Sequence, residues 1–391
     1  MLYKHLHNQY YKLFLTCLVL FTSITVNAQE REEMLFLSGY IKNLHEFSFI
    51  DNLDQLQWTT ILHNRLNFKY TPSDEITVRL EFRNRLFYGD NVKNILGFSN
   101  FISEDNGMVN LSWNVIDDGS LLFNITIDRA LFNYTKGNWD ITLGRQRVNW
   151  GMNLAWNPND IFNTYNLLDF DYEERPGSDA MRVQYYLSDF SKIEVAAKKG
   201  SGKDNYIVAA MYKFNTGTYD IQLITGVYQK DWVLGAGWAG NLKNAGFKGE
   251  VSYFVPYERY SNAKNVLSAS FSVDYGFKKG LYINGSILYN SIDNEASNNL
   301  ETLVYTNLSA KNLMPFEFSG FLQLAKEFTP IFKGSFSSIY SPTNHSVIII
   351  PNLAYSIATN WELDFTGQSF FQFEDNKTLG NSFFARLRWS F

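Results

Sequence analysis

Apolar and polar residues alternate along this chain from about residue 35 to its end, in segments of about ten residues separated by short turns. In one segment Leu66, Phe68 and Tyr70 share a face, while Arg65 and Asn67 share the other. Successive side chains of a β-strand point to opposite faces, so a repeat of two predicts strands, whereas a helix repeats near 3.6. The pattern therefore predicts an all-β chain.

The same alternation returns in later segments. After the turn at 72–74, Val78, Leu80 and Phe82 face one way, and Arg79 and Arg83 face the other. The later apolar faces comprise Tyr219, Ile221, Leu223 and Val227; Leu267, Ala269, Phe271, Val273 and Tyr275; Leu281, Ile283 and Ile287; and Trp361, Leu363 and Phe365. Strands joined by such short turns pair as antiparallel hairpins.

Two all-β architectures compete for this pattern. In a soluble sandwich or propeller the apolar faces meet in a core, whereas in an outer-membrane barrel they face lipid and the polar faces line a wet interior. Charges such as Lys192, Glu194, Lys248 and Glu250 on the polar faces suit either arrangement. Short turns that alternate with long polar connections favour the barrel.

The C-terminal segment "NSFFARLRWSF" supplies a further argument for the barrel. Trp389 and Phe391 end an alternating strand whose other face carries Arg386 and Arg388. A terminal aromatic residue at this place resembles the targeting signal of outer-membrane barrels, and the chain resembles the Gram-negative porin-like barrel family. The resemblance implies a protein that the barrel-assembly machinery inserts into outer-membrane lipid.

The number of strands follows from counting turns back from Phe391. All short turns fall on one side if residues 89–125, including the strand-like "MVNLSWNVI", form one excursion on the other side. The count then predicts a transmembrane antiparallel barrel of about 18 strands, or 16 or 20 if one hairpin is miscounted. A barrel of this size encloses an aqueous channel unless something fills it.

The N-terminus has the layout of a secretory signal peptide over residues 1–28. Lys4 and Lys12 precede an apolar run from Leu13 to Val26, which is short for a membrane helix, and small residues surround Ala28. Cys17 lies in this run, so its removal leaves no cysteine. No linker interrupts residues 29–391, which we interpret as one barrel domain, and the net charge of −5 argues against a nucleic-acid partner.

Three long connections interrupt the barrel pattern, over residues 89–125, 149–178 and 291–314. The second contains Trp150 and Trp156 among many other apolar residues, which is too much apolar surface for a disordered loop. We expect it to enter the channel as a constriction loop, as in the porins that the chain resembles. The alternative is an outer cap packed on neighbouring loops.

Arginines of the polar faces cluster on strands that lie next to each other once the last strand closes on the first. We expect this pore-lining basic arc to comprise Arg65, Arg79, Arg83, Arg85, Arg129, Arg145, Arg147, Arg182, Arg386 and Arg388. Arg145 and Arg147 share parity with the lipid-facing Leu143, so either a bulge at Gly144 flips the register before them or they lie at the rim.

The constriction loop carries charges that can face this arc. They are Asp160, Asp169, Asp171, Glu173, Glu174 and Arg175, with Asp179 beside them. A basic wall opposite an acidic loop selects solutes by charge, and arginine binds carboxylate or phosphate groups with its two-pronged guanidinium. The alternative is that these residues pair with each other and hold the loop in place.

Cofactor and metal sites are not indicated. Asp169, Asp171 and Glu173 have a spacing that invites calcium, but no glycine lies within the cluster and the match to a known calcium loop is poor. Trp150 and Trp156 are better interpreted as buried anchors than as platforms for sugar rings.

The sequence therefore predicts a porin-like channel, a monomer or homotrimer, for passive diffusion of small hydrophilic and preferably anionic solutes. One alternative is a structural or assembly barrel with a closed lumen that works with partner proteins. A minor alternative is an outer-membrane hydrolase, which is disfavoured because His345 and Ser346 are adjacent on an extended segment and point to opposite faces.

Overall fold

The alternating segments form nineteen antiparallel strands of one sheet in a computed structural model, which describes residues 34–50, 53–164, 167–168, 177–257, 264–292, 308–373 and 376–391. The signal peptide predicted over residues 1–28 lies outside the described residues. The strands are β1 (Leu35–Phe49), β2 (Gln57–Ser73), β3 (Ile76–Gly89), β4 (Ser112–Asp118), β5 (Leu121–Lys136), β6 (Trp139–Gln146), β7 (Ser178–Ser188), β8 (Ser191–Lys199), β9 (Tyr206–Thr216), β10 (Tyr219–Tyr228), β11 (Asp231–Leu242), β12 (Ala245–Pro256), β13 (Val266–Gly276), β14 (Leu281–Asn290), β15 (Phe318–Thr329), β16 (Phe332–Ser341), β17 (Ser346–Ala358), β18 (Trp361–Gln372) and β19 (Lys377–Ser390).

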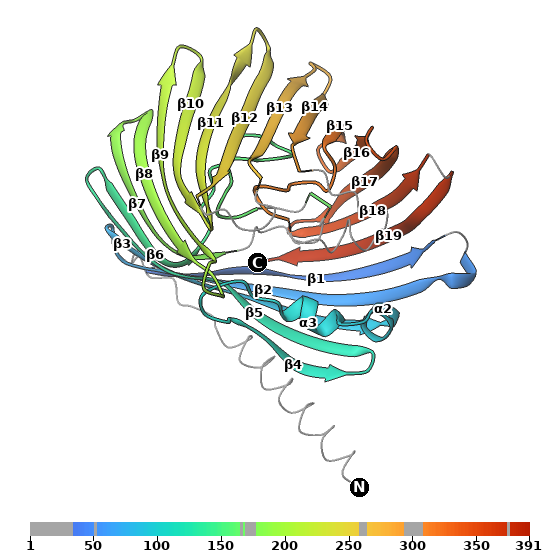
Figure 1. Ribbon diagram of the computed structural model, residues 1–391. Coiled ribbons are helices and arrows are strands. Elements are labelled where there is room, and N and C mark those ends of the chain that lie inside the picture. The colour runs from blue at the N-terminus through green and yellow to red at the C-terminus, as the bar shows by residue number, and fades with distance from the viewer. Residues whose placement is uncertain are drawn as a thin grey trace. The chain divides into compact units, whose positions relative to one another are not determined.

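Eighteen of these strands close into a barrel (Figure 1), because β1 pairs with β2 on one edge and with β19 on the other. The remaining strand, β4, pairs with β5 beside the closed ring. It contains the second half of "MVNLSWNVI" and does not span the barrel. The predicted 18-stranded antiparallel barrel is therefore confirmed.

The connections differ in length between the two ends of the barrel. At the short-turn end, where β1 begins and β19 ends, the strands are joined by two to four residues, such as 137–138 and 277–280. Positive φ angles at Gly137, Gly217, Lys243 and Asn360 give several of these turns the tight backbone that hairpins need. The other end, the long-loop end, carries the connections 90–120, 147–177 and 291–317.

Side-chain exposure is the reverse of that in a soluble protein. On the outer face, Leu143 and Leu234 are each 58% exposed and Ile287 is 59% exposed, whereas the inward-facing Lys42 and Glu250 are 0% exposed. Exposing so large an apolar surface to water is unfavourable, whereas contact with the hydrocarbon core of a membrane is favourable. A closed barrel can lie in that core because all its backbone hydrogen bonds are made between its own strands. The apolar faces therefore meet lipid.

Aromatic pairs lie near both ends of the strands. Trp361 and Trp389 stack with ring centroids 6.1 Å apart at the short-turn end. Trp58 and Tyr88 lie 5.5 Å apart at the long-loop end, where Trp232 and Tyr257 form a similar pair. Aromatic girdles at two heights are typical of a barrel that spans a membrane.

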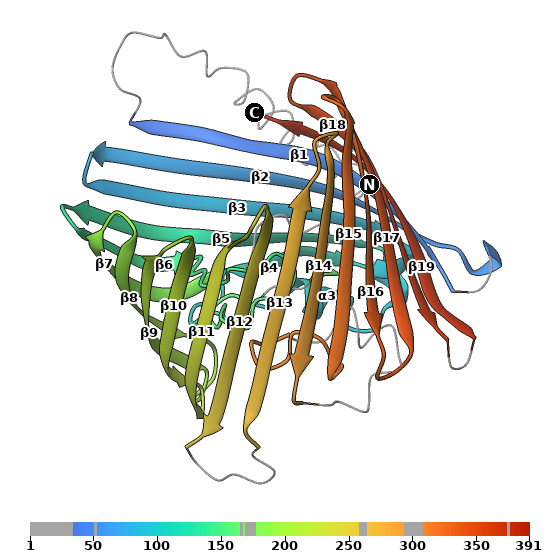
Figure 2. The same ribbon diagram turned by 90° about the horizontal axis from the view of Figure 1, so that it is seen from above.

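Three segments from the long-loop end fold against the inner face of the sheet (Figure 2). The first contains the short helices α2 (Asp90–Asn94) and α3 (Phe98–Ser103), which pack on Leu44, Phe87 and Leu122. The others are residues 147–168 and 308–317, of which the described residues join two further apolar clusters. A 3-10 helix, η1 (Leu53–Gln55), lies between β1 and β2. In the described residues no helix is long and apolar enough to cross a bilayer.

β6 is the shortest strand of the closed ring, with eight residues, and a sealing segment (residues 105–111) contacts the long-loop ends of β6 and β7. Its Leu111 carbonyl accepts a hydrogen bond from Ile127 N–H of β5 at 2.8 Å. Its other end reaches the turn after β8, where Gly107 forms a bridge with Gly200. The excursion between β3 and β5 therefore completes the wall.

Candidate functional site in the barrel interior

One side of the interior is strongly basic. Strands β19, β1, β2, β3 and β5 are consecutive neighbours in the sheet, as the sequence predicts. We call their inward cations the basic wall: Lys42, Arg65, Lys69, Arg79, Arg83, Arg85, Arg129, Arg386 and Arg388. The ladder places Lys69 opposite Arg79, Arg65 opposite Arg83 and His63 opposite Arg85.

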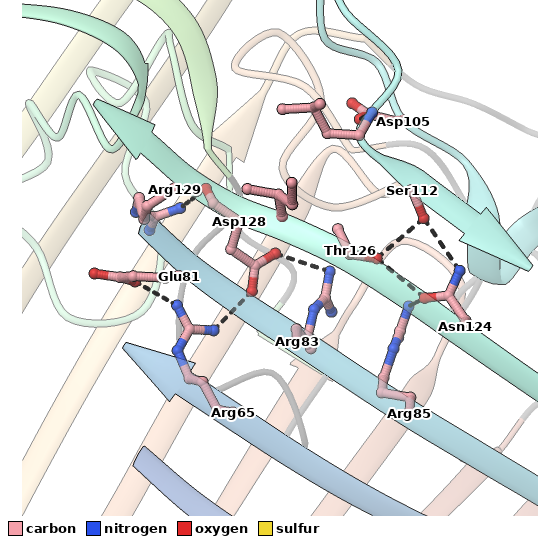
Figure 3. A network of polar contacts seen from close by, with 12 residues as sticks. Arg65, Glu81, Arg83, Arg85, Asp105, Ser112, Asn124, Thr126, Asp128 and Arg129 are labelled. Carbon is pink, nitrogen blue, oxygen red and sulfur yellow. Dashed lines mark hydrogen bonds and ion pairs between the residues drawn. The ribbon is translucent and has the colours of Figure 1, made fainter. Parts of the chain in front are cut away.

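Asp128 is the centre of the basic wall (Figure 3). One of its carboxylate oxygens accepts a hydrogen bond from Arg65 Nη1 at 2.7 Å, and the other lies 3.1 Å from Arg83 Nη2. Arg65 also binds Glu81 at 2.6 Å. Arg65 and Asp128 are 2% and 3% exposed, so the wall holds its charges as a buried network and not as separate cations.

A bulge explains how Asp128 enters this network. Strict alternation places Asp128 on the outward face with Ala130, but the ladder between β3 and β5 shifts register between Glu81 and Phe82. Asp128 and Arg129 are consequently both buried, and Arg129 Nη1 donates to the Asp128 carbonyl at 2.8 Å. Sequence parity identified Arg129 as inward-facing but missed Asp128, the residue that binds two of the arginines.

The basic wall continues across the seam between β19 and β1. Arg386 Nε donates to Asp364 of β18 at 2.6 Å. The Arg388 guanidinium stacks on the Tyr40 ring at 4.6 Å, and Lys42 Nζ lies 5.3 Å from the same ring. The Tyr40 hydroxyl is 3.3 Å from His63 Nε2. Aromatic and carboxylate groups thus hold the cations at fixed positions.

Arg85 connects the basic wall to the helical excursion. Its Nη2 donates to the carbonyl of Ile102 at 3.0 Å and to Asn124 Oδ1 at 3.1 Å. Asn124 in turn donates to Ser112 Oγ of β4 at 3.2 Å (Figure 3). The guanidinium therefore anchors the end of α3 inside the barrel.

The opposite side of the interior holds the inward loop, residues 147–168. We call its binding surface on β8, β10, β12 and β13 the seat wall: Glu194, Gln222, Glu250, Ser252, Ser270 and Ser272. Glu250 of β12 accepts hydrogen bonds from three loop N–H groups, those of Met152, Asn153 at 2.8 Å and Asn159 at 2.9 Å. The loop enters the lumen, as the sequence predicts for a constriction-type loop.

Side chains of the loop complete this attachment. Asn153 Nδ2 donates to Ser270 Oγ at 2.8 Å, and its Oδ1 accepts from Ser272 Oγ at 2.7 Å. Asn159 Oδ1 accepts from Ser252 Oγ at 2.7 Å. Asparagine side chains carry both a donor and an acceptor, which lets an irregular segment bind a row of serine hydroxyls.

Trp150 and Trp156 anchor the loop by their rings. The Trp150 indole N–H donates to Glu194 Oε1 at 2.8 Å, and its ring packs edge-to-face on Phe162. Trp156 packs on Phe321 of β15, with ring centroids 6.1 Å apart. Each tryptophan is 2% exposed, so neither presents a ring face to a sugar.

The third inward segment packs beside this loop. Lys311 Nζ donates to Asp231 Oδ2 of β11 at 2.7 Å. Leu313, Met314 and Phe316 join Trp156 in one buried apolar cluster against β14–β18. Two inward segments therefore narrow the lumen from the same side.

Arg145 and Arg147 lie apart from the basic wall. Both ladders of β6 continue through Gly144 without a register shift, so the predicted flip does not occur, although Gly144 has φ +110°. Arg145 binds Asp105 at 2.6 Å and Asp179 at 2.7 Å beneath the sealing segment, at the long-loop end of its strand. Arg147 is exposed just after β6.

Arg182, which the sequence also predicts to belong to the basic arc, lies on β7, and its Nη2 is 3.7 Å from a carboxylate oxygen of Asp140. Asp160 is 1% exposed and accepts a hydrogen bond from Trp150 N–H within the loop. Asp169, Asp171, Glu173, Glu174 and Arg175 lie outside the described residues. Among the described residues, Glu81, Asp128 and Asp364, which bind arginines of the basic wall, all lie on strands.

Asp169, Asp171 and Glu173, whose spacing invites calcium but for which no site is predicted, also lie outside the described residues. Within the described part of the chain, no group of three or more His, Cys, Asp or Glu side chains is placed to hold a metal ion.

Sequence reasoning missed the partners of the recognised charges. Four acids make the contacts that the sequence did not reveal, and each of them binds a residue at least 22 positions away: Asp128, Asp364, Glu194 and Glu250. Glu194 also has a local partner, Lys192. Inward parity was a usable signal for Glu194 and Glu250, but alternation alone does not state which loop groups reach them.

No family model matches the chain, and no curated protein sequence matches it. Solved structures with a similar fold include Pseudomonas aeruginosa OccK11 (OpdR), with a TM-score of 0.57, 9% identity and coverage of 94% of this chain and 100% of that chain. Acinetobacter baumannii OccAB4 has a TM-score of 0.57 and 10% identity, over 93% of this chain and 100% of that chain. Pseudomonas aeruginosa OpdK, solved with vanillate, has a TM-score of 0.54 and 10% identity, over 91% of this chain and 98% of that chain. These likenesses confirm the predicted porin-like barrel fold.

Proposed function

We propose that this protein is a passive outer-membrane channel for small hydrophilic solutes, with a preference for anions. The observation that carries the proposal is the basic wall, whose guanidinium groups lie on consecutive strands and face the interior. OpdK, which has a similar barrel, is described as an outer membrane protein and was solved with vanillate, an anion. An N-terminal signal peptide and assembly by the barrel-assembly machinery belong to the same proposal.

The basic wall offers an anion several positions along one path. An arriving carboxylate or phosphate exchanges its hydration for guanidinium donors that strand neighbours already hold in place. Because Arg65, Arg83 and Arg386 are paired with wall acids, an anion competes with those acids and is not trapped, which suits passage better than tight binding. The inward loop on the seat wall limits the size of the solute.

Conductance across planar bilayers tests this function. The purified barrel is expected to form an ohmic pore whose reversal potential in a salt gradient indicates anion preference. Arg79→Ala/Arg83→Ala is expected to reduce that preference, because it removes two inward charges. Lys136→Ala, at the short-turn end where Lys136 pairs with Glu75, is the matched control. An unchanged reversal potential in the double variant refutes the charge filter.

A second candidate is a structural or assembly barrel with a closed lumen. The specific observation in its favour is burial, since Lys42, His63 and Arg65 are at most 2% exposed although they face the interior. A folded wild-type barrel that carries no current in any salt favours this candidate over the channel.

The hydrolase alternative would need a serine activated by a histidine, and the loop around His345 does not contain such a pair. Ser346 Oγ donates to Asn344 Oδ1 at 2.7 Å and the His345 backbone has φ 51° in the tight turn. Phospholipid and peptide hydrolysis with His345→Ala as control tests this alternative. Monomer and homotrimer are distinguished by the mass of the barrel in detergent.

A further inference from the structure

One buried carboxylate holds the backbone of the inward loop. Glu250 is 0% exposed in the middle of β12, and its Oε1 accepts from Met152 N–H and Asn153 N–H. Its Oε2 accepts from Asn159 N–H, so one side chain binds both limbs of the turn between residues 152 and 159. These three donors lie in an irregular segment that has no strand partner of its own.

The chemistry of these contacts requires a carboxylate. Two oxygens with four lone-pair positions accept three N–H groups without competition. A glutamine of the same shape has one acceptor oxygen, and its amide group would place N–H donors against a backbone N–H. An unsatisfied buried backbone donor is unfavourable, so the loop would leave this position.

The other contacts of the loop are easier to replace. Glu194 binds one indole N–H and is also paired with Lys192 at 2.8 Å, while Ser252 and Ser270 contribute neutral hydroxyl contacts. Water satisfies a hydroxyl or an indole N–H once the loop moves. Glu250 alone among these contacts binds main-chain groups from two limbs of the turn.

We propose that Glu250 is the positioning residue that keeps the inward loop against the seat wall and thereby sets the size limit of the channel. The effect on size rests on the proposed channel function, whereas the effect on the loop does not. Loss of the carboxylate releases the turn at 152–159, and the lumen widens on the side opposite the basic wall. Charge preference, which the basic wall supplies, is retained.

Glu250→Gln tests the size limit through the partitioning of neutral polyethylene glycols of graded mass into the open pore. Larger polymers than in the wild type are expected to enter, with higher conductance and an unchanged sign of the reversal potential. Glu194→Gln, the same substitution at an acid whose one contact with the loop is the Trp150 indole, is expected to change less. Asp274→Asn is the matched control, because Asp274 faces inward on β13 and pairs with Lys248 at 3.3 Å. Equal polymer cut-offs in Glu250→Gln and the wild type overturn the effect on size.

A cysteine label reports the position of the loop independently of current. Cys17 is the sole cysteine of the sequence, and Ala155 in the loop is 4% exposed. Ala155→Cys is expected to react slowly with a membrane-impermeant maleimide, and about tenfold faster when combined with Glu250→Gln. Heat-modifiable migration in gels verifies that each barrel is folded, and Glu250→Asp gives a second variant if Glu250→Gln fails to fold.

The two readouts separate the inference from the proposed function. Faster labelling in a barrel that never conducts supports the role of Glu250 and refutes the channel. Unchanged labelling in folded Glu250→Gln and Glu250→Asp barrels refutes the role of Glu250, whatever the conductance. Short bifunctional thiol reagents that join Asn153→Cys to Ser272→Cys are expected to restore the wild-type polymer cut-off in Glu250→Gln, because they replace a side-chain contact of 2.7 Å by a covalent link.

Discussion

The basic wall and the seat wall are built from the same alternating strands but satisfy their inward charges differently. In the basic wall, Arg65 and Arg83 bind side chains of neighbouring strands, with Asp128 between them. In the seat wall, Glu250 binds backbone N–H groups of an inserted loop. The Asp128 network is therefore complete within the strands, although Arg85 of the same wall also binds the helical excursion, whereas Glu250 is satisfied only with the loop in place.

In the proposed channel, we expect this difference to separate charge selection from size selection. Arg65, Arg83 and Arg386 are held by acids on strands, so their positions should not depend on the inward loop. Glu250 binds the inward loop, so its substitution should change how much of the lumen the loop occupies. Substitutions in the two walls should consequently have separable effects.

The largest expected effect is that of Asp128→Ala in the basic wall. It leaves Arg65 and Arg83 without their shared carboxylate, and removal of one partner from a buried ion pair costs about 3–5 kcal/mol. The free energy of unfolding in lipid vesicles, from denaturant titration, measures this loss. Asp140→Ala is the control, because Asp140 is 19% exposed and 3.7 Å from Arg182. Equal losses in the two variants would contradict the central place of Asp128.

A smaller effect is expected from Trp150→Phe in the seat wall. The ring contact with Phe162 is largely kept, but the indole donor to Glu194 is lost, which costs about 1–2 kcal/mol. The same denaturant titration measures it, and Trp139→Phe on the lipid-facing side serves as comparison. A loss as large as that of Asp128→Ala would mean that the seat wall depends on this one hydrogen bond as strongly as the basic wall depends on Asp128.

The smallest effect is expected from Lys136→Ala, outside both walls. Lys136 pairs with Glu75 at the short-turn end, where the two side chains are 65% and 43% exposed, and exposed pairs contribute little because water screens them. The unfolding transition is expected to coincide with that of the wild type. A clear shift would show that the charges that matter extend beyond the two walls.

The fold could be predicted from the sequence because an alternation with a period of two residues identifies both a strand and the face of that strand that points outward. The pattern alone places Leu66 and Phe68 on the outward face and Arg65 on the inward face, and this placement does not require knowing which strand pairs with theirs. The strand count needed one further decision, to treat 89–125 as a single excursion, and the structure has strand β4 there without a change in the closed ring.

The site could be predicted only in part, because its geometry depends on long-range pairing and on local irregularity. A single bulge brings Asp128 to the interior, and alternation cannot locate a bulge. Glu250 was visible as an inward charge, but its partners lie more than 90 residues away in an irregular loop. The arginines were visible because their strands are neighbours in any closed barrel.

The pairing of β4 with β5 has a consequence for the edges of the sheet. Because β6 ends at Gln146 and pairs only with the short-turn half of β5, the long-loop half of that edge has no neighbour in the closed ring, and β4 pairs with it instead. Unpaired strand edges attract other chains. The bridge from Gly107 to Gly200 carries this cover on to the turn after β8, so one excursion shields the edge that the short β6 leaves open.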